Sequence, residues 1–114
     1  MKLVELTQDL ELTNLTPEIV CDEDLTGGYA SDLLSDVLVH APEGGVLITL
    51  QIHLNVIAVA SHAGLQAVLF SSGRTPEEDV IARAVAEGLS LFVSPADTFE
   101  IVGRLYQAGV RSGV

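Results

Sequence analysis

Residues 24–36, with the sequence DLTGGYASDLLSD, carry the densest run of groups that could bind a ligand. Two glycines before a helix allow a tight turn and leave backbone N–H groups unpaired, which suits anions and polar ligands. The same residues could equally form only a turn capped by Asp24 and Thr26. The candidate ligand-binding residues of this stretch are Asp24, Thr26, Gly27, Gly28, Tyr29, Ser31 and Asp32.

Polar side chains also follow two apolar runs that are typical of buried strands. Gln51, His53 and Asn55 come after the run VLITL, and Gly73 and Arg74 come after QAVLF. Ligands of open α/β sheets tend to bind at the carboxyl ends of the strands, so these residues are ligand-binding candidates too. The alternatives are capping of the next helix, one hydrogen-bonded histidine, and a surface ion pair of Arg74. We expect the DLTGG turn to lie beside the first three residues.

The acidic residues of this region argue against a simple phosphate site. Asp22, Glu23 and Asp24 would repel a phosphate unless a cation lay between them. Asp32 and Asp36 are four residues apart on a predicted helix and could share a Mg²⁺ ion through their oxygens, although a solvated acidic face is the favoured interpretation. No Cys/His cluster indicates zinc. We therefore predict neither a metal nor a cofactor.

An enzyme built on these residues would need Asp24, Asp32 and His53 within hydrogen-bond reach in one pocket. The pattern GxxxxGK[ST] has no match, the only lysine is Lys2, and GxSxG, HExxH and GxGxxG are also missing. Phosphoryl transfer from ATP by this chain is therefore unsupported. We assign no catalytic residue.

The overall charge narrows the classes of partner. The chain has 114 residues, with 16 Asp and Glu against 5 Lys and Arg, and a net charge of −11. Such a surface repels nucleic acid and anionic membranes but could dock a basic protein. Cys21 is the only cysteine, so no disulfide forms within the chain. We expect one domain, residues 1–114, and a cytoplasmic location, since no secretory signal or long apolar span is evident.

Hydrophobic periodicity and breaker residues predict the elements that position these candidates. From residue 46 onward the pattern alternates strand and helix, which favours a single-domain α/β sandwich with a mostly parallel sheet. Residues 55–60 could be strand, but the small residues around them favour helix. The predicted helices are 2–10, 31–40 capped by Ser31, one between residues 51 and 63, one from Thr75 to Gly88, and 97–108 with Phe99, Val102, Leu105 and Tyr106 on its inner face; the predicted strands are 17–22, 46–50, 66–70 and 89–93.

The segment DLTGGYASDLLSDV, followed by VLITLQIHLNVIAVA, resembles the DRTGG domain family. The resemblance extends through SSGRTPEEDVIARAVAEGLSLF and DTFEIVGRLYQAGV, and so covers nearly the whole chain. Leu25 replaces the basic or polar second residue of the motif, so a ligand contact from that side chain is not expected. The resemblance implies a fold similar to the N-terminal domain of HPr kinase/phosphorylase, which lacks the P-loop part of that enzyme. Related domains sit beside CBS domains in regulated pyrophosphatases and in phosphate acetyltransferases, and look like dimerising or regulatory modules.

Together these observations predict a non-catalytic regulatory or ligand-sensing domain that acts as a homodimer. Its ligand is not identified by the sequence, and an adenine nucleotide is the first to test. The alternative is an acidic protein-interaction subunit of a larger complex. An enzyme that uses Asp24, Asp32 and His53 is the third and weakest interpretation.

Overall fold

A five-stranded sheet forms the centre of the protein, with its strands in the order β1-β5-β4-β3-β2. The computed structural model describes residues 1–113. Strands β2 to β5 run parallel, and β1 pairs with β5 in the antiparallel direction. The mostly parallel α/β architecture predicted from the sequence is therefore confirmed. The strands are β1 (Thr13–Asn14), β2 (Gly28–Ala30), β3 (Val46–Thr49), β4 (Ala67–Phe70) and β5 (Ser90–Val93).

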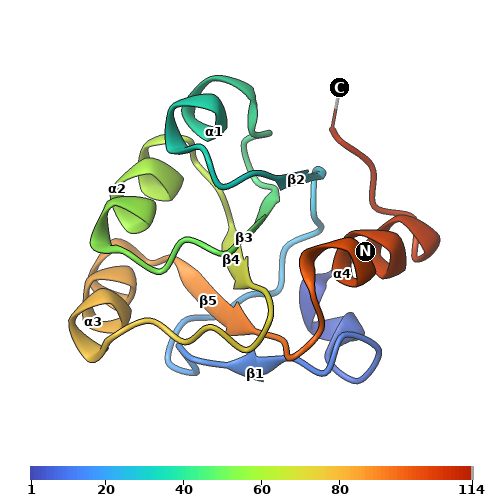
Figure 1. Ribbon diagram of the computed structural model, residues 1–114, viewed down its shortest axis with the longest axis horizontal. Helices are drawn as coiled ribbons and strands as arrows, with labels where there is room; N and C mark the ends of the chain where they lie inside the picture. Colours follow the sequence, from blue (N-terminus) through green and yellow to red (C-terminus); the bar gives the residue numbers. More distant parts are fainter. Residues whose placement is uncertain (114) are drawn as a thin grey trace.

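Helices cover both faces of the sheet, as Figure 1 shows. Helices α1 (Leu34–His40), α2 (Leu54–His62) and α3 (Glu78–Glu87) pack on one face. Helix α4 (Thr98–Gln107) and the short 3-10 helix η1 (Leu3–Leu6) pack on the other. Strands β3 and β4 are buried along their whole length, which explains why both appear in the sequence as continuous apolar runs.

The unit from β3 through α2 to β4 agrees with the prediction. Residues 54–62 form a helix and not a strand. The His53 side chain caps this helix, because its Nδ1 accepts a hydrogen bond from the Asn55 N–H at 3.1 Å. Helix α3 ends as expected at Gly88, which adopts the left-handed conformation with a φ of 71°.

Two predicted helix starts are wrong. Helix α1 begins three residues later than expected, at Leu34, and Ser31 is not its N-cap. Instead, the Ser31 Oγ accepts from the Leu33 N–H at 3.1 Å in the turn before the helix. Helix α3 is preceded by Glu77 as its N-cap and not by Thr75.

The N-terminal third differs most from the sequence-based prediction. The helix expected at 2–10 is only η1 followed by turns, and the strand expected at 17–22 is a turn and irregular chain. Strand β2 was not predicted, because its glycine was assigned to a turn. On α4, Ile101 and Leu105 form the inner face, whereas Phe99 is 86% exposed and Tyr106 59% exposed.

Candidate functional site

The DLTGG residues 24–28 and the residues that follow β3 lie at opposite edges of the sheet, whereas Asp32 contacts Gln51 at the second of these edges. Gly28 pairs with Val46 at the start of β3, whereas Gln51 and His53 follow the end of that strand. Because parallel strands rise about 3.3 Å per residue, the length of β3 separates the DLTGG residues from the later set. The prediction that they lie side by side is wrong.

At the amino edge, the DLTGG residues are committed to contacts within the protein. The Thr26 Oγ donates to the Glu43 carbonyl at 2.6 Å, and the Gly28 N–H donates to the Arg111 carbonyl at 2.7 Å. A Cβ on Gly27 would lie 2.7 Å from the Cα of Gly113. Three segments of the chain thus lie in close backbone contact here, namely residues 26–28, 42–45 and 111–113. We call this place the glycine crossing. The glycines serve close packing at this edge.

Asp24 also lies at this edge, where its Oδ1 is 3.1 Å from the ammonium of Met1. It is therefore separated by the sheet from His53 and from Asp32, which lies beyond the carboxyl end of β2. The structure does not bring these three residues into one pocket.

Tyr29, in the middle of β2, turns its side chain toward α1. Its hydroxyl donates to the Asp36 Oδ2 at 2.6 Å, and the other oxygen of Asp36 contacts the His40 Nδ1 at 3.0 Å. The hydrogen bond from Tyr29 lowers the pKa of Asp36 below its ordinary value of 3.8. The same hydrogen bond raises the pKa of Tyr29 above its ordinary value of 10.0. The pair therefore ties β2 to α1.

Asp32 lies between β2 and α1 and ties that loop to the end of β3. Its Oδ1 accepts from the Thr49 Oγ1 at 2.9 Å and from the Leu50 N–H at 2.7 Å. The side-chain Nε2 of Gln51 donates to the backbone carbonyl of Asp32 at 3.1 Å. Asp32 precedes α1, so it does not share a helix face with Asp36 as expected.

Three predicted residues do come together in a hollow at the carboxyl edge of the sheet. Gln51, His53 and Arg74 line a cavity of about 380 Å³, which we call the carboxyl-edge groove. Asn55 and Gly73 are not among its lining residues, although both lie in the adjoining segments. The other lining residues are Ile52, Leu54, Glu77, Asp79 and Val80.

The carboxyl-edge groove is lined by both hydrogen-bond donors and carboxylates. The Arg74 Nε donates to the Leu50 carbonyl at 2.8 Å, and Arg74 has no ion pair with residues 1–113. The His53 Nδ1 accepts from a backbone N–H, so in neutral His53 the proton is on Nε2. Glu77 and Asp79 supply acceptors. The groove thus fits a ligand that has both an anionic and a hydrogen-donating end.

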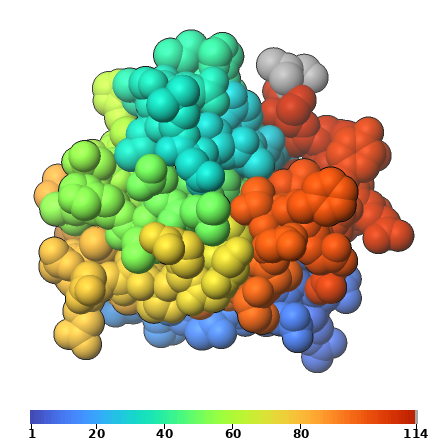
Figure 2. All heavy atoms as spheres, in the orientation of Figure 1, coloured from blue at the N-terminus to red at the C-terminus, as the bar shows by residue number. Residues whose placement is uncertain are grey.

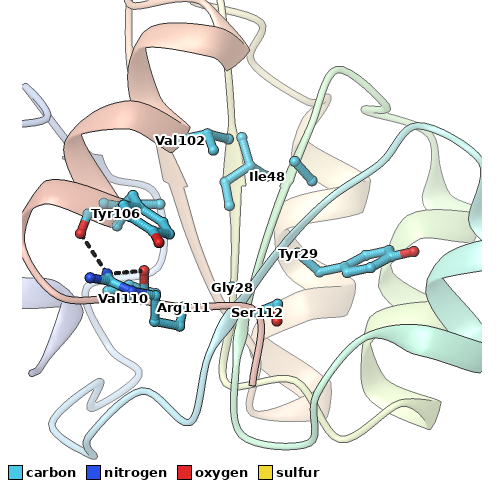
Figure 3. Close-up of a pocket in the computed structure, with 10 residues that line it drawn as sticks. Gly28, Tyr29, Ile48, Val102, Tyr106, Val110, Arg111 and Ser112 are labelled. Atoms are coloured by element: carbon cyan, nitrogen blue, oxygen red, sulfur yellow. Dashed lines mark hydrogen bonds between the residues drawn. The ribbon is translucent and has the colours of Figure 1, made fainter. Parts of the chain in front are cut away.

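A second, larger cavity was missed by the sequence analysis. It has a volume of about 480 Å³ and lies between β2 and α4, beside the C-terminal segment; we call it the β2–α4 groove (Figure 3). Gly28 and Tyr29 contribute to it, but the Tyr29 ring points away (Figure 3). The groove exists because β2 pairs with β3, and no pattern in the sequence indicated this pairing. Its lining residues are Gly28, Tyr29, Ala30, Ile48, Val102, Leu105, Tyr106, Val110, Arg111 and Ser112.

Within residues 1–113, no three His, Cys, Asp or Glu side chains are grouped to hold a metal ion. In the same residues no helix has the length and apolar character needed to cross a membrane. Cys21 is buried, and desolvation is the main cause that raises the pKa of its thiol. Its Sγ lies 3.3 Å from the Gln66 Oε1. These features assign the residue to the core.

The structure thus combines a mostly parallel α/β fold with two ligand-sized hollows. No family model matches the sequence, and no curated protein matches it. Among solved structures, the chain is similar to the CBS and DRTGG domains of the regulatory region of a Clostridium perfringens pyrophosphatase, complexed with the activator diadenosine tetraphosphate. The TM-score is 0.71 at 13% sequence identity, and the match covers 98% of this chain and 48% of that one. The protein therefore has a DRTGG-like fold, and it spans about half the length of that regulatory region.

Proposed function

We propose that residues 1–114 are one DRTGG-like regulatory domain that senses a small molecule and has no catalytic activity of its own. The observation that carries this proposal is the carboxyl-edge groove, where Gln51, His53 and Arg74 line one hollow at the ends of parallel strands. No nucleophile with a neighbouring base accompanies them among the residues described. Binding without transformation is the simpler use of such a site.

An adenine nucleotide is the ligand to test first. The similar pyrophosphatase region holds diadenosine tetraphosphate as its activator, and this kinship motivates the choice. The chemistry of the groove is compatible with it, because Arg74 can receive a phosphate while Glu77 and Asp79 can accept from the amino group of adenine. The two carboxylates would oppose a highly charged phosphate chain, so Mg²⁺ should strengthen binding of the longer nucleotides.

The test is a thermal-shift titration with AMP, ATP and diadenosine tetraphosphate, each with and without Mg²⁺. A ligand at a hundred times its Kd stabilises the folded state by about 2.7 kcal/mol, which raises the Tm of a domain of this size by roughly 10 °C. Arg74→Gln should abolish the shift. The matched control is Arg83→Gln, since Arg83 is an exposed arginine on α3 that pairs with Glu87 and does not line the groove.

A flat titration with all three nucleotides would overturn the nucleotide proposal. A shift that survives Arg74→Gln would show that binding occurs elsewhere. The alternative function, an acidic interaction subunit, predicts instead that a basic partner protein is captured and then released by salt, with no nucleotide effect.

We also propose that the domain is a homodimer and that α1 forms the contact. Leu38 and Val39 of this helix are 44% and 74% exposed, and Leu33 just before it is 64% exposed. These three exposed apolar side chains belong to or adjoin the helix that follows the edge strand β2, and Figure 2 shows α1 at the top of the molecule. Sedimentation should give a dimer that Val39→Glu dissociates. Val20→Glu is the control, because Val20 is 78% exposed in the irregular segment between β1 and β2 and is not part of α1. A monomer at high micromolar concentration would overturn the proposal.

A further inference from the structure

The β2–α4 groove is a gap in the cover of the sheet. Three helices pack on the α1 side, but on the other side only α4 and the N-terminal segment are available to cover five strands. The floor over β2 and β3 is formed by Gly28, Ala30 and Ile48, of which two are too small to fill the space. An apolar hollow of about 480 Å³ remains, a volume within the range of small-molecule sites.

Arg111 is the one charged residue among those that line this hollow, and Tyr106 and Ser112 are its other polar neighbours on that side. The Arg111 Cζ lies 3.7 Å from the centre of the Tyr106 ring, and its Nη1 donates to the carbonyls of Tyr106 and Val110 at 2.7 and 3.1 Å (Figure 3). Stacking and two hydrogen bonds hold the guanidinium in one orientation, so a ligand would not have to order it.

The remaining donors of Arg111 are the ones that recognise carboxylates. With Nη1 committed, the edge formed by Nε and Nη2 presents two parallel N–H groups, which is the arrangement that binds a carboxylate with two hydrogen bonds. No residue from 1 to 113 accepts from this edge or pairs with Arg111. Arg111 shares this property with Arg74, whereas Arg83 and Arg104 pair with carboxylates of their own helices.

We propose that the β2–α4 groove binds an apolar organic carboxylate, with its carboxylate on Arg111 and its apolar body against Ile48, Val102 and Leu105. This site is distinct from the carboxyl-edge groove and goes beyond the nucleotide sensing proposed above. Its occupant is a small molecule with one negative charge. A nucleotide is a poor fit, because its polar base and ribose would be placed against apolar walls.

The test uses pairs of probes that differ in charge. Binding of 2-naphthoate is compared with that of 2-naphthamide, and binding of decanoate with that of decanol, by titration calorimetry on the full chain. The two pairs distinguish an aromatic from an aliphatic body. In at least one pair, the carboxylate should bind about tenfold or more tightly than its neutral counterpart.

Single substitutions test whether the probes bind in the β2–α4 groove. Arg111→Gln should remove the preference for the carboxylate and leave the neutral probe unchanged, and Ala30→Leu should weaken both by filling the floor. Arg83→Gln is the control and should alter neither, because Arg83 pairs with Glu87 on α3 and does not line the groove. The expected folded state of each variant is checked by circular dichroism.

Several outcomes would overturn the proposal. These are equal affinity within both probe pairs, no binding of any probe, and an unchanged carboxylate preference in Arg111→Gln. Competition by inorganic phosphate as strong as that by decanoate would refute the apolar half of the claim. If Ala30→Leu changes the sedimentation coefficient while no probe binds, a second copy of the chain fills the groove instead.

Discussion

Gly27→Ala is the sharpest test of the glycine crossing. The new Cβ would lie 2.7 Å from both the Cα and the N of Gly113 and 2.9 Å from the carbonyl oxygen of Arg111. These are backbone atoms, so no side-chain rotation can relieve the contact. The segment 111–113 must move away, and the hydrogen bond from the Gly28 N–H to Arg111 weakens with it.

The magnitude follows from three effects. Overpacking of this kind costs about 1–3 kcal/mol, and a lost backbone hydrogen bond costs about 0.5–1.5 kcal/mol. Replacing glycine by alanine returns about 0.4–1 kcal/mol by restricting the unfolded chain. We therefore expect a net loss of about 0.5–4 kcal/mol, which lowers the Tm by roughly 2–16 °C.

Urea denaturation followed by circular dichroism measures this change. Gly103→Ala is the matched control, because a Cβ at this helical position meets nothing within 4 Å. It should stabilise the protein by up to about 1 kcal/mol, since alanine favours a helix over glycine. In a chain that ends at Val110, Gly27→Ala should cost little beyond the truncation itself. An unchanged stability of Gly27→Ala in the full chain would refute the backbone crossing.

Two further predictions concern single hydrogen bonds. In Tyr29→Phe, the bond to Asp36 is lost. Because it lowers the pKa of Asp36 below 3.8, its contribution is present above pH 3.8 and is lost as the pH falls through the folded-state value. The same bond raises the pKa of Tyr29 above 10.0. Its contribution is therefore present below pH 10.0 and is lost as the pH rises through the folded-state pKa of Tyr29. Urea denaturation at several pH values should therefore show the largest difference between variant and native protein at neutral pH, and a difference independent of pH would contradict this. Asp97→Ala removes the side chain that accepts from the Glu100 N–H at 2.9 Å at the start of α4, and should cost about 1 kcal/mol in the same assay, whereas Asp97→Asn should cost little.

The strands that were predicted correctly carry their own signal. Val46–Thr49 and Ala67–Phe70 are buried on both faces, so each appears as an apolar run regardless of its partner. The carboxyl-edge groove could be anticipated for a similar reason, because polar residues after parallel strands meet at one edge of the sheet.

The missed features depend on distant parts of the chain. Strand β2 has only three residues, and its pairing with β3 overrides the turn preference of Gly28. The DLTGG motif resembled an anion site because its neighbours could not be foreseen: the Thr26 hydroxyl is bonded to Glu43, and the Gly28 N–H is bonded to Arg111. The β2–α4 groove requires the position of α4, whose Phe99 and Tyr106 were placed on the inner face although both are exposed.

The glycine crossing also has a consequence for the order of folding. The unit β3-α2-β4 is local in sequence and can form early, whereas the contact of Gly27 with Gly113 joins positions separated by most of the chain. Closing so long a loop has an entropic cost that contacts with the formed sheet must offset. We therefore expect the last residues to dock after the sheet has formed. Interactions that form after the transition state affect mainly the rate of unfolding. The contacts of the DLTGG motif with the last residues should therefore slow unfolding and leave the folding rate almost unchanged.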